Sequence, residues 1–157
     1  MLNNDQRPGF HGALAAGEVF IRDYTASDYP DLLRLLSEVY QSNVSRADLE
    51  SHYLGDNQEI ILAIDGARLV GCSFLSYNTD YIRISNTVFV TYVAVDETVR
   101  HRGIGTKLFE EIETRARARS CTAIELTSAD SRIAAHSFYH ALSFTKKKTT
   151  VFIKELY

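Results

Sequence analysis

The chain has 157 residues, of which 45% are hydrophobic, and its formal net charge is −3. A chain of this length fits one globular domain that buries about two-thirds of its unfolded surface. Apart from Lys146–Lys148, which is typical of a solvated turn, the basic residues are spread out, so nucleic acid is not an expected partner. No stretch approaches the about 18 apolar residues of a membrane span, and no signal-peptide pattern opens the chain. A cytoplasmic protein without a membrane partner is expected.

The chain has two cysteines, Cys72 and Cys121, each inside or beside an apolar run. They show neither a CxxC spacing nor the residue count of a disulfide framework. We therefore expect reduced, mostly buried thiols.

The first residues differ in composition from the rest. Residues 1–17 contain a Pro-Gly pair and many small residues, which predicts a flexible leader. A single domain is expected over 18–157.

Two helices are expected early in that domain. Apolar residues recur at helical spacing over 27–42, with Pro30 in the first turn and Thr25 or Ser27 as the cap. A second helix is expected over 45–54, opened by Ser45 and Asp48 as a variant of the capping box.

Strand patterns surround and follow these helices. One strand is expected over 18–24, and two more over 59–77, joined at Asp65-Gly66, which is a strong hairpin signal. Residues 81–95 continue the sheet and end in an apolar run.

The second half begins with an amphipathic helix after Gly105. Its Glu111/Arg115 and Glu113/Arg117 spacings support a helix, and its apolar stripe consists of Leu108, Phe109, Ile112 and Ala116. A short strand over 122–128, a helix over 131–142 and a closing strand over 149–156 should follow. The order predicts an α/β fold: one mixed central sheet of about six to seven strands with helices on both faces.

Gly103 and Gly105 lie at the start of a helix, where backbone N–H groups lack intrahelical partners and carry partial positive charge. Glycine there lets the backbone touch an anion, and Arg100 and Arg102 would add charged donors. The plain alternative is a glycine-rich turn between a strand and a helix. The P-loop spacing is absent, and a dinucleotide fingerprint would need a third glycine at Leu108.

Two motifs resemble one known family. Val93-Ala94-Val95, an acidic turn and Arg100-x-x-Gly103-x-Gly105 are similar to the acetyl-CoA pyrophosphate loop of the GNAT N-acetyltransferases. Downstream, "RIAAHSFYHALSF" resembles the family's Ala-x-x-x-Tyr helix followed by Gly-Phe. The likeness runs from about Glu18 to the C-terminus. The second motif also resembles a GNAT subgroup with the pattern Arg-x-x-Ala-His-x-Phe-Tyr, which is similar to the aminoalkylphosphonate acetyltransferases.

The resemblance implies the site residues. Acetyl-CoA would be bound by Val93, Ala94, Val95, Arg100, His101, Arg102, Gly103, Ile104, Gly105, Thr106 and Arg132. The pantetheine arm would pair with Val93 and Val95, and a backbone N–H near Val95, where the strand leaves its neighbour, would stabilise the oxyanion.

Three positions depart from the family pattern. Ser143 stands where glycine is usual, Arg132 where many members carry asparagine, and Tyr92 where several relatives place a catalytic glutamate. The last departure leaves the general base open. Glu125, the acid inside a candidate central strand, could take the amine proton through water, or it could be a solvated strand residue.

Tyr139 is the candidate group for stabilising the departing thiolate, and its alternative is a core aromatic residue. His136 and His140 have a spacing that could share a metal, but without a third ligand no metal is expected. Four aromatic residues could line an acceptor pocket or belong to the core: Tyr77, Tyr81, Phe89 and Tyr92.

The expected function is transfer of acetyl from acetyl-CoA to a primary amine, with no metal. The alternatives are a CoA-binding sensor or partner-binding module without efficient turnover, and a nucleotide-binding protein. The acceptor's identity and the formation of a homodimer are left open by the sequence.

Overall fold

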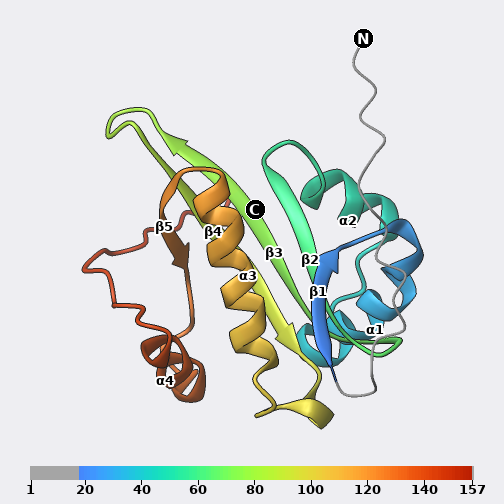
Figure 1. The fold of residues 1–157 in the computed structure, drawn as a ribbon. Coiled ribbons are helices and arrows are strands. Elements are labelled where there is room, and N and C mark those ends of the chain that lie inside the picture. Colours follow the sequence, from blue (N-terminus) through green and yellow to red (C-terminus); the bar gives the residue numbers. More distant parts are fainter. Residues whose placement is uncertain (1–17, 157) are drawn as a thin grey trace. The chain divides into compact units, whose positions relative to one another are not determined.

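The structure is a computed structural model that describes residues 18–156, and Figure 1 shows its ribbon. The predicted leader, residues 1–17, lies outside the described residues. In chain order the elements are β1 (Val19–Asp23), the 3-10 turn η1 (Ala26–Asp28), α1 (Tyr29–Tyr40), α2 (Arg46–Tyr53), β2 (Gln58–Asp65), β3 (Arg68–Asp80), β4 (Ser85–Val95), the 3-10 turn η2 (Glu97–Val99), α3 (Ile104–Ala118), β5 (Cys121–Leu126) and α4 (Ile133–Ala141). The predicted order is confirmed up to this last helix.

Five strands form one sheet in the order β1-β2-β3-β4-β5. The pairs β1–β2, β2–β3 and β3–β4 are antiparallel. The β2–β3 hairpin turns beside the Asp65↔Arg68 pair, where Gly66 has a φ of 62° that glycine adopts without steric cost. β5 follows α3 and runs beside β4 in the same direction, so the sheet is mixed (Figure 1). The mixed α/β sheet and the hairpin are confirmed.

The predicted count of six to seven strands is wrong, and within the described residues the sheet has five. The closing strand expected over 149–156 is absent there, and its apolar side chains Val151, Phe152, Ile153 and Leu156 are 77–92% exposed. Alternating apolar residues predict which side chains share a face, but a strand also needs a partner edge for its backbone. The pattern contains no information about that partner.

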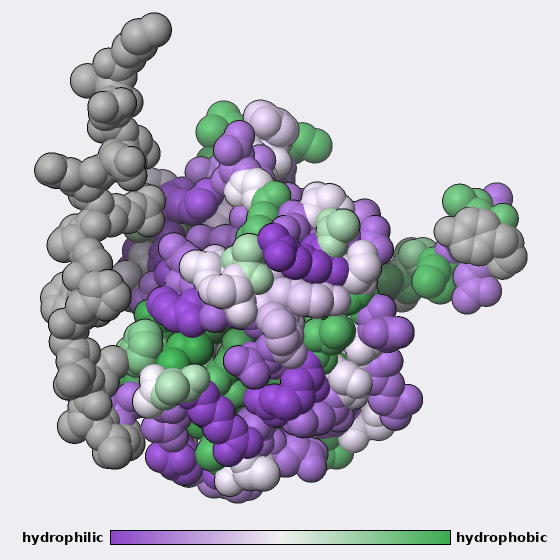
Figure 2. All heavy atoms as spheres, turned by 90° about the vertical axis from the view of Figure 1, so that its right-hand side faces the viewer, coloured by the Kyte–Doolittle hydropathy of each residue, from purple (hydrophilic) through white to green (hydrophobic). Residues whose placement is uncertain are grey.

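Helices cover both faces of the sheet. α3 packs on one face through the predicted stripe, since Leu108, Phe109, Ile112 and Ala116 are all buried. α1 and α2 pack on the other face, and the cluster they form with the strands contains Tyr24, Leu32, Leu35, Leu36, Leu49, Ile60, Leu62, Ile64, Leu69, Cys72, Phe74 and Ala94. Figure 2 shows the side that carries α1 and α2, where apolar residues reach the surface among hydrophilic ones.

The helix starts follow the predicted chemistry with one difference. At α2 the Ser45 hydroxyl oxygen accepts a 3.1 Å hydrogen bond from the backbone N–H of Asp48. At α1 the N-cap is Asp28, because the turn η1 precedes the helix. Thr25 caps that turn instead, and its N–H donates to the Asp28 carboxylate at 2.8 Å.

By their contacts the residues form two units, the first ending at Glu125 and the second beginning at Leu126. The first holds β1 to β4, α1 to α3 and most of β5. The second holds α4 and the C-terminal segment.

Candidate functional site

The loop between β4 and α3 is built on a helix start without a side-chain cap. Gly103 is the N-cap of α3, with a φ of 77° in the left-handed region. A Cβ added there would meet nothing within 4 Å. The backbone conformation therefore favours glycine at 103, and the space beside it is open. The N–H groups of the next residues, Ile104, Gly105 and Thr106, point along the helix axis toward that space.

Both loop arginines are paired with acids on the surface. Arg100 contacts Glu97 at 2.9 Å, and Arg102 contacts Asp65 at 3.1 Å. About half of each arginine side chain is exposed, and ion pairs of this kind contribute little to stability. Each guanidinium can therefore leave its acid for an anion at the helix start without much loss of free energy.

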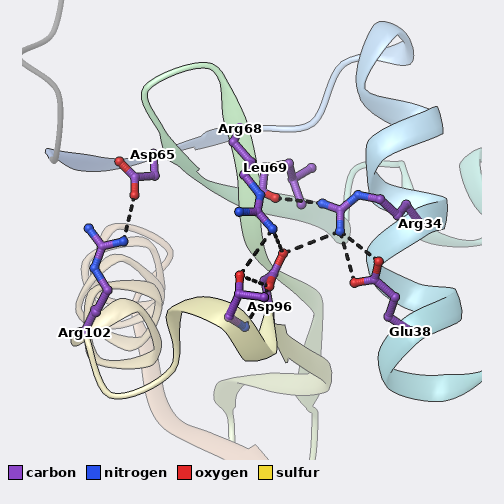
Figure 3. A network of polar contacts seen from close by, with 8 residues as sticks. Arg34, Glu38, Asp65, Arg68, Leu69, Asp96 and Arg102 are labelled. Carbon is purple, nitrogen blue, oxygen red and sulfur yellow. Dashed lines mark hydrogen bonds and ion pairs between the residues drawn. The ribbon is translucent and has the colours of Figure 1, made fainter.

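A buried carboxylate fixes the base of this loop (Figure 3). The side chain of Asp96 is 3% exposed, and it accepts from the N–H of Thr98 at 2.9 Å and from its hydroxyl at 2.6 Å. Arg68 binds the second oxygen at 2.6 Å, and Arg34 approaches it at 3.5 Å. The Thr98 hydroxyl, with support from the two arginines, lowers the pKa of Asp96 although burial opposes this.

Arg34 extends this network to α1 and β3. It donates to the Leu69 carbonyl at 3.1 Å and pairs with Glu38 at 3.0 Å (Figure 3). Asp96 thereby links β3, α1 and the start of the loop, which positions the chain between Val95 and Gly103.

The last residues of β4 present backbone groups at an edge of the sheet. The N–H of Asp96 donates to the Val70 carbonyl at 2.9 Å, and bonding in an antiparallel ladder alternates from residue to residue. Ala94 therefore faces β3, whereas the N–H and C=O groups of Val93 and Val95 point away from it. The Val93 carbonyl accepts a 2.6 Å hydrogen bond from the hydroxyl of Tyr40 in α1.

β5 covers only the first part of β4. It has six residues against eleven in β4, and near its start the Thr122 hydroxyl donates to the Asn86 carbonyl at 3.2 Å. Because the strands run in the same direction, β5 ends before Val93. A β-bulge at Thr91 also shifts the register, since Phe74 pairs with Tyr92 and Leu75 with Val90.

A pocket of about 490 Å³ lies next to this end of β4, between α1, α2 and the sheet. Its aromatic lining consists of Tyr40, Tyr53, Phe74 and Tyr92. The remaining lining residues are Leu36, Ser42, Val44 and Leu49. Of the four aromatic residues predicted for a pocket or the core, Tyr92 lines this one. Tyr77 instead packs under Arg119 at 4.0 Å and donates to Glu59, and Tyr81 is 87% exposed at the β3–β4 turn.

Glu125 lies on β5, the strand beside β4, and is half-buried. It belongs to the first unit. Its role as a base acting through water stays a prediction.

The remaining predicted residues belong to the second unit. Arg132 is the exposed N-cap of α4, and Tyr139 lies in its last turn, half-buried, with its ring 5.6 Å from that of Phe138 and 5.9 Å from that of Phe144. Ser143, at the usual glycine position, has a φ of 66°. The N–H of Phe144 donates to the Tyr139 carbonyl at 2.9 Å, and that of Ser143 to the His140 carbonyl at 3.0 Å, which is the Schellman arrangement.

The structure brings the strand residues Val93 to Val95 and the loop residues 100 to 106 together in the first unit, with Asp96 between them. Sequence reasoning missed Asp96, Tyr40 and Gly71. A Cβ at Gly71 would lie 3.2 Å from the Ala94 carbonyl and 3.2 Å from Ile104 Cγ2, so this glycine lets the start of α3 approach the sheet. A glycine inside an apolar strand run is a signal that could have found it.

Among residues 18–156, no group of three His, Cys, Asp or Glu side chains could hold a metal ion. His140 instead contacts the Phe144 carbonyl through Nδ1 at 3.1 Å. Cys72 is a buried free thiol whose pKa burial raises to about 12, and Cys121 is free and partly buried. No helix in the described part of the chain has the length and apolar character needed to cross a membrane.

Residues 23–144 match the acetyltransferase (GNAT) family. The chain belongs to the GNAT acetyltransferases. It is therefore a GNAT-type N-acetyltransferase by family, and the family resemblance seen in its motifs is confirmed. A comparison with curated protein sequences gave no significant match.

Several solved structures share the fold of this chain. A transcriptional regulator from Bacillus halodurans C-125 is 22% identical, with a TM-score of 0.79, over 88% of this chain and 100% of that chain. An aminoglycoside acetyltransferase from an uncultured soil metagenomic sample, in complex with trehalose, is 18% identical with a TM-score of 0.77, over 88% and 96% of the two chains. The aminoglycoside N-acetyltransferase AAC(6')-Iy in complex with CoA is 17% identical with a TM-score of 0.79, over 90% and 97%. At these identities the likeness concerns the fold.

Proposed function

We propose that this GNAT protein transfers the acetyl group of acetyl-CoA to a primary amine of a small molecule. The observation that carries the proposal is the pairing of an uncapped helix start at Gly103 with the outward-facing backbone of Val93 and Val95. A helix start of this kind favours a diphosphate, and a strand edge whose backbone faces away from β3 favours the amides of a pantetheine arm.

The CoA diphosphate is assigned to the loop, where the backbone of Gly103 to Thr106 supplies N–H donors. Arg100, His101 and Arg102 lie ahead of them, and the two arginines add charged donors once they leave Glu97 and Asp65. Ala94 holds β4 against β3 while its neighbours face the cofactor. Arg132 is assigned to CoA through the family resemblance.

The reaction is direct transfer. The lone pair of the neutral amine attacks the thioester carbonyl carbon, and a C–N bond and a tetrahedral oxyanion form. The amine loses a proton, the C–S bond breaks, and the thiolate takes a proton, which gives an amide and free CoA. A backbone N–H at the end of β4 stabilises the oxyanion, Glu125 accepts the proton through water, and Tyr139 stabilises the thiolate.

The helix "RIAAHSFYHALSF" supports a position near the Arg-x-x-Ala-His-x-Phe-Tyr subgroup, which is similar to the aminoalkylphosphonate acetyltransferases. A second function has one observation in its favour. Tyr92 stands where several relatives carry a catalytic glutamate, as expected of a CoA-binding sensor or partner-binding module without efficient turnover.

Two measurements test the proposal. Acetyl-CoA at about 100 times its dissociation constant should stabilise the fold by about 2.7 kcal/mol in thermal unfolding, whereas NAD should not. A screen of primary amines with acetyl-CoA, followed by free-thiol release, should identify substrates. Stabilisation without thiol release for any amine would favour the sensor, and a preference for NAD would contradict CoA binding altogether.

A further inference from the structure

The pocket beside β4 is defined by aromatic rings. The ring of Tyr92 neighbours the other three, with its centroid 5.3 Å from that of Tyr40, 5.7 Å from Phe74 and 6.3 Å from Tyr53, all edge to face. Phe74 is 2% exposed, whereas Tyr92 is 39% exposed. The lining thus combines a buried ring, Phe74, with an accessible ring, Tyr92. Its volume of about 490 Å³ falls within the range of about 300–1,000 Å³ that is usual for small-molecule sites.

None of the lining side chains carries a charge at neutral pH, since they are aromatic, aliphatic or, at Ser42, hydroxyl. Burial, followed by the neighbouring Tyr92, raises the pKa of Tyr53, which keeps that phenol neutral. Two acids flank the lining residue Leu49. Asp48 accepts a 2.6 Å hydrogen bond from the Ser45 hydroxyl, and Glu50 binds Tyr24 and Arg46, each at 2.9 Å. The lining therefore offers a bound molecule apolar area, ring faces and phenol oxygens, but no carboxylate.

We propose that this pocket takes a primary amine carried on an apolar, aromatic-sized body, and that it rejects polycationic amines and amines that bear a carboxylate. A single ammonium can rest against ring faces, to which cation–π attraction holds it. Each further ammonium would lose water without gaining a counter-charge, and a carboxylate would find no cation among the lining residues. The catalytic part of this inference rests on the proposed function, whereas the binding part does not.

The position of the pocket beside β4 also affects the protonation of a bound amine. Tyr92 directly precedes Val93, the first residue assigned to the pantetheine arm, so an amine over the Tyr92 ring lies next to the expected thioester. Loss of water without a carboxylate partner lowers the pKa of the bound amine, because the attraction of the ring faces offsets only part of the desolvation cost. Tyr92 stands where several relatives carry a catalytic glutamate. Without that base, the apolar lining itself favours the neutral form of the amine, which is the nucleophile.

Three amines separate these features of the ligand. Phenethylamine has one ammonium on an aromatic body, phenylalanine adds only a carboxylate to it, and sisomicin is polycationic. For each amine, kcat/KM is measured by thiol release from acetyl-CoA, and binding is measured separately by calorimetry. We expect phenethylamine to exceed the other two by at least about 100-fold in kcat/KM, because an unpaired buried charge costs several kcal/mol.

A charge variant makes the test specific to the pocket. Ser42→Asp places a carboxylate at a half-buried lining position, and Asn43→Asp adds the same charge at the exposed neighbouring residue outside the lining. Ser42→Asp should reduce the preference for phenethylamine over sisomicin by about tenfold or more, and Asn43→Asp should leave it within about twofold. An unchanged preference in the folded Ser42→Asp variant would place the amine elsewhere.

The outcomes separate the inference from the proposed function. Thiol release with sisomicin or phenylalanine at a rate equal to or above that with phenethylamine would overturn the ligand class and leave acetyl transfer intact. If no amine releases thiol, the proposed reaction fails, and calorimetry decides the ligand class alone. Phenethylamine binding that Ser42→Asp alters would then support the class, and no detectable binding would overturn it.

Discussion

The hydroxyl of Tyr40 in α1 donates a 2.6 Å hydrogen bond to the carbonyl oxygen of Val93 in β4. The same tyrosine ring lines the amine pocket. Because the Val93 carbonyl points away from β3, this bond holds the strand edge that is assigned to the pantetheine arm. One residue thus contacts both proposed substrate positions, through its ring on one side and its hydroxyl on the other.

Tyr40→Phe keeps the ring and deletes that hydrogen bond. The free energy of unfolding should fall by about 1 kcal/mol, the usual worth of such a bond. The KM for acetyl-CoA should rise a few-fold, whereas the KM for the amine should stay within about twofold. Tyr24→Phe is the matched control, because it deletes the hydroxyl that donates to Glu50 at 2.9 Å. A rise confined to the amine KM would contradict the role of the Val93 edge.

Gly103→Asn tests whether the open space at the start of α3 holds the diphosphate. Asparagine tolerates a positive φ, and within the described residues its Cβ would meet no atom beyond its chain neighbours and its own helix backbone within 4 Å, so the fold should lose no more than about 1 kcal/mol. Its side chain would enter the anion position and should weaken CoA binding at least about tenfold. Gly66→Asn is matched, with a φ of 62° and equally open space in the β2–β3 turn, and should leave CoA binding nearly unchanged. Equal CoA affinities of the two variants would show that the diphosphate does not bind at Gly103.

Two serines occupy left-handed positions after helices, Ser120 with a φ of 55° and Ser143 with a φ of 66°. Replacing either by glycine relieves the steric cost of Cβ and should stabilise the protein by about 0.5–1 kcal/mol in denaturant unfolding. Ser137→Gly, inside α4, should instead destabilise it by roughly 0.5 kcal/mol. Loss of stability at both left-handed positions would show that the serine side chains make stabilising interactions there.

Most of the fold follows from local patterns in the sequence. The order of strands and helices, the α3 stripe and the turn at Asp65-Gly66 are encoded by residues close together in the chain, and the structure confirms them. The segment 149–156 has an equally regular alternation but forms no strand. Pairing depends on a distant backbone edge, which alternation within one segment does not specify.

The candidate site divides in the same way. The loop from Arg100 to Thr106 is contiguous and could be predicted from its glycines and arginines. Tyr40 and Tyr53 could not, because they join Tyr92 only once α1 and α2 pack on the sheet. Asp96 is also a tertiary feature, since Arg34 and Arg68 reach it from 62 and 28 residues away.

Asp28 provides a test of pH dependence. It accepts two hydrogen bonds from Arg22, at 2.6 and 2.7 Å, and the Arg22 side chain is the main cause that lowers its pKa from 3.8 to about 2. A lowered folded-state pKa contributes stability that is present above about pH 4 and is lost as the pH falls toward 2. Asp28→Asn should therefore lower the free energy of unfolding by at most about 2 kcal/mol at pH 7. Near pH 2 the loss of the carboxylate charge should change it very little.

The control for Asp28 is Asp31→Asn, at an exposed position in the first turn of α1. It should change stability by only a few tenths of a kcal/mol at pH 7. Urea unfolding at several pH values measures both variants. A cost for Asp28→Asn that does not depend on pH would indicate that the ion pair with Arg22 is not its source.

Tyr139→Phe tests the group proposed for thiolate departure. The change keeps the ring and its contacts with Phe138 and Phe144 while deleting only the hydroxyl. A phenol of pKa about 10 next to a thiolate of pKa about 8.5 acts best as a hydrogen-bond donor to the leaving sulfur, so kcat should fall about ten- to a thousand-fold with little change in acetyl-CoA affinity. Tyr77→Phe is the control, because that hydroxyl donates to Glu59 away from the amine pocket. Turnover is measured by thiol release and affinity by calorimetry, since only a loss in kcat at constant affinity identifies an interaction made in the transition state. Wild-type kcat in the Phe variant would make Tyr139 a packing residue of α4.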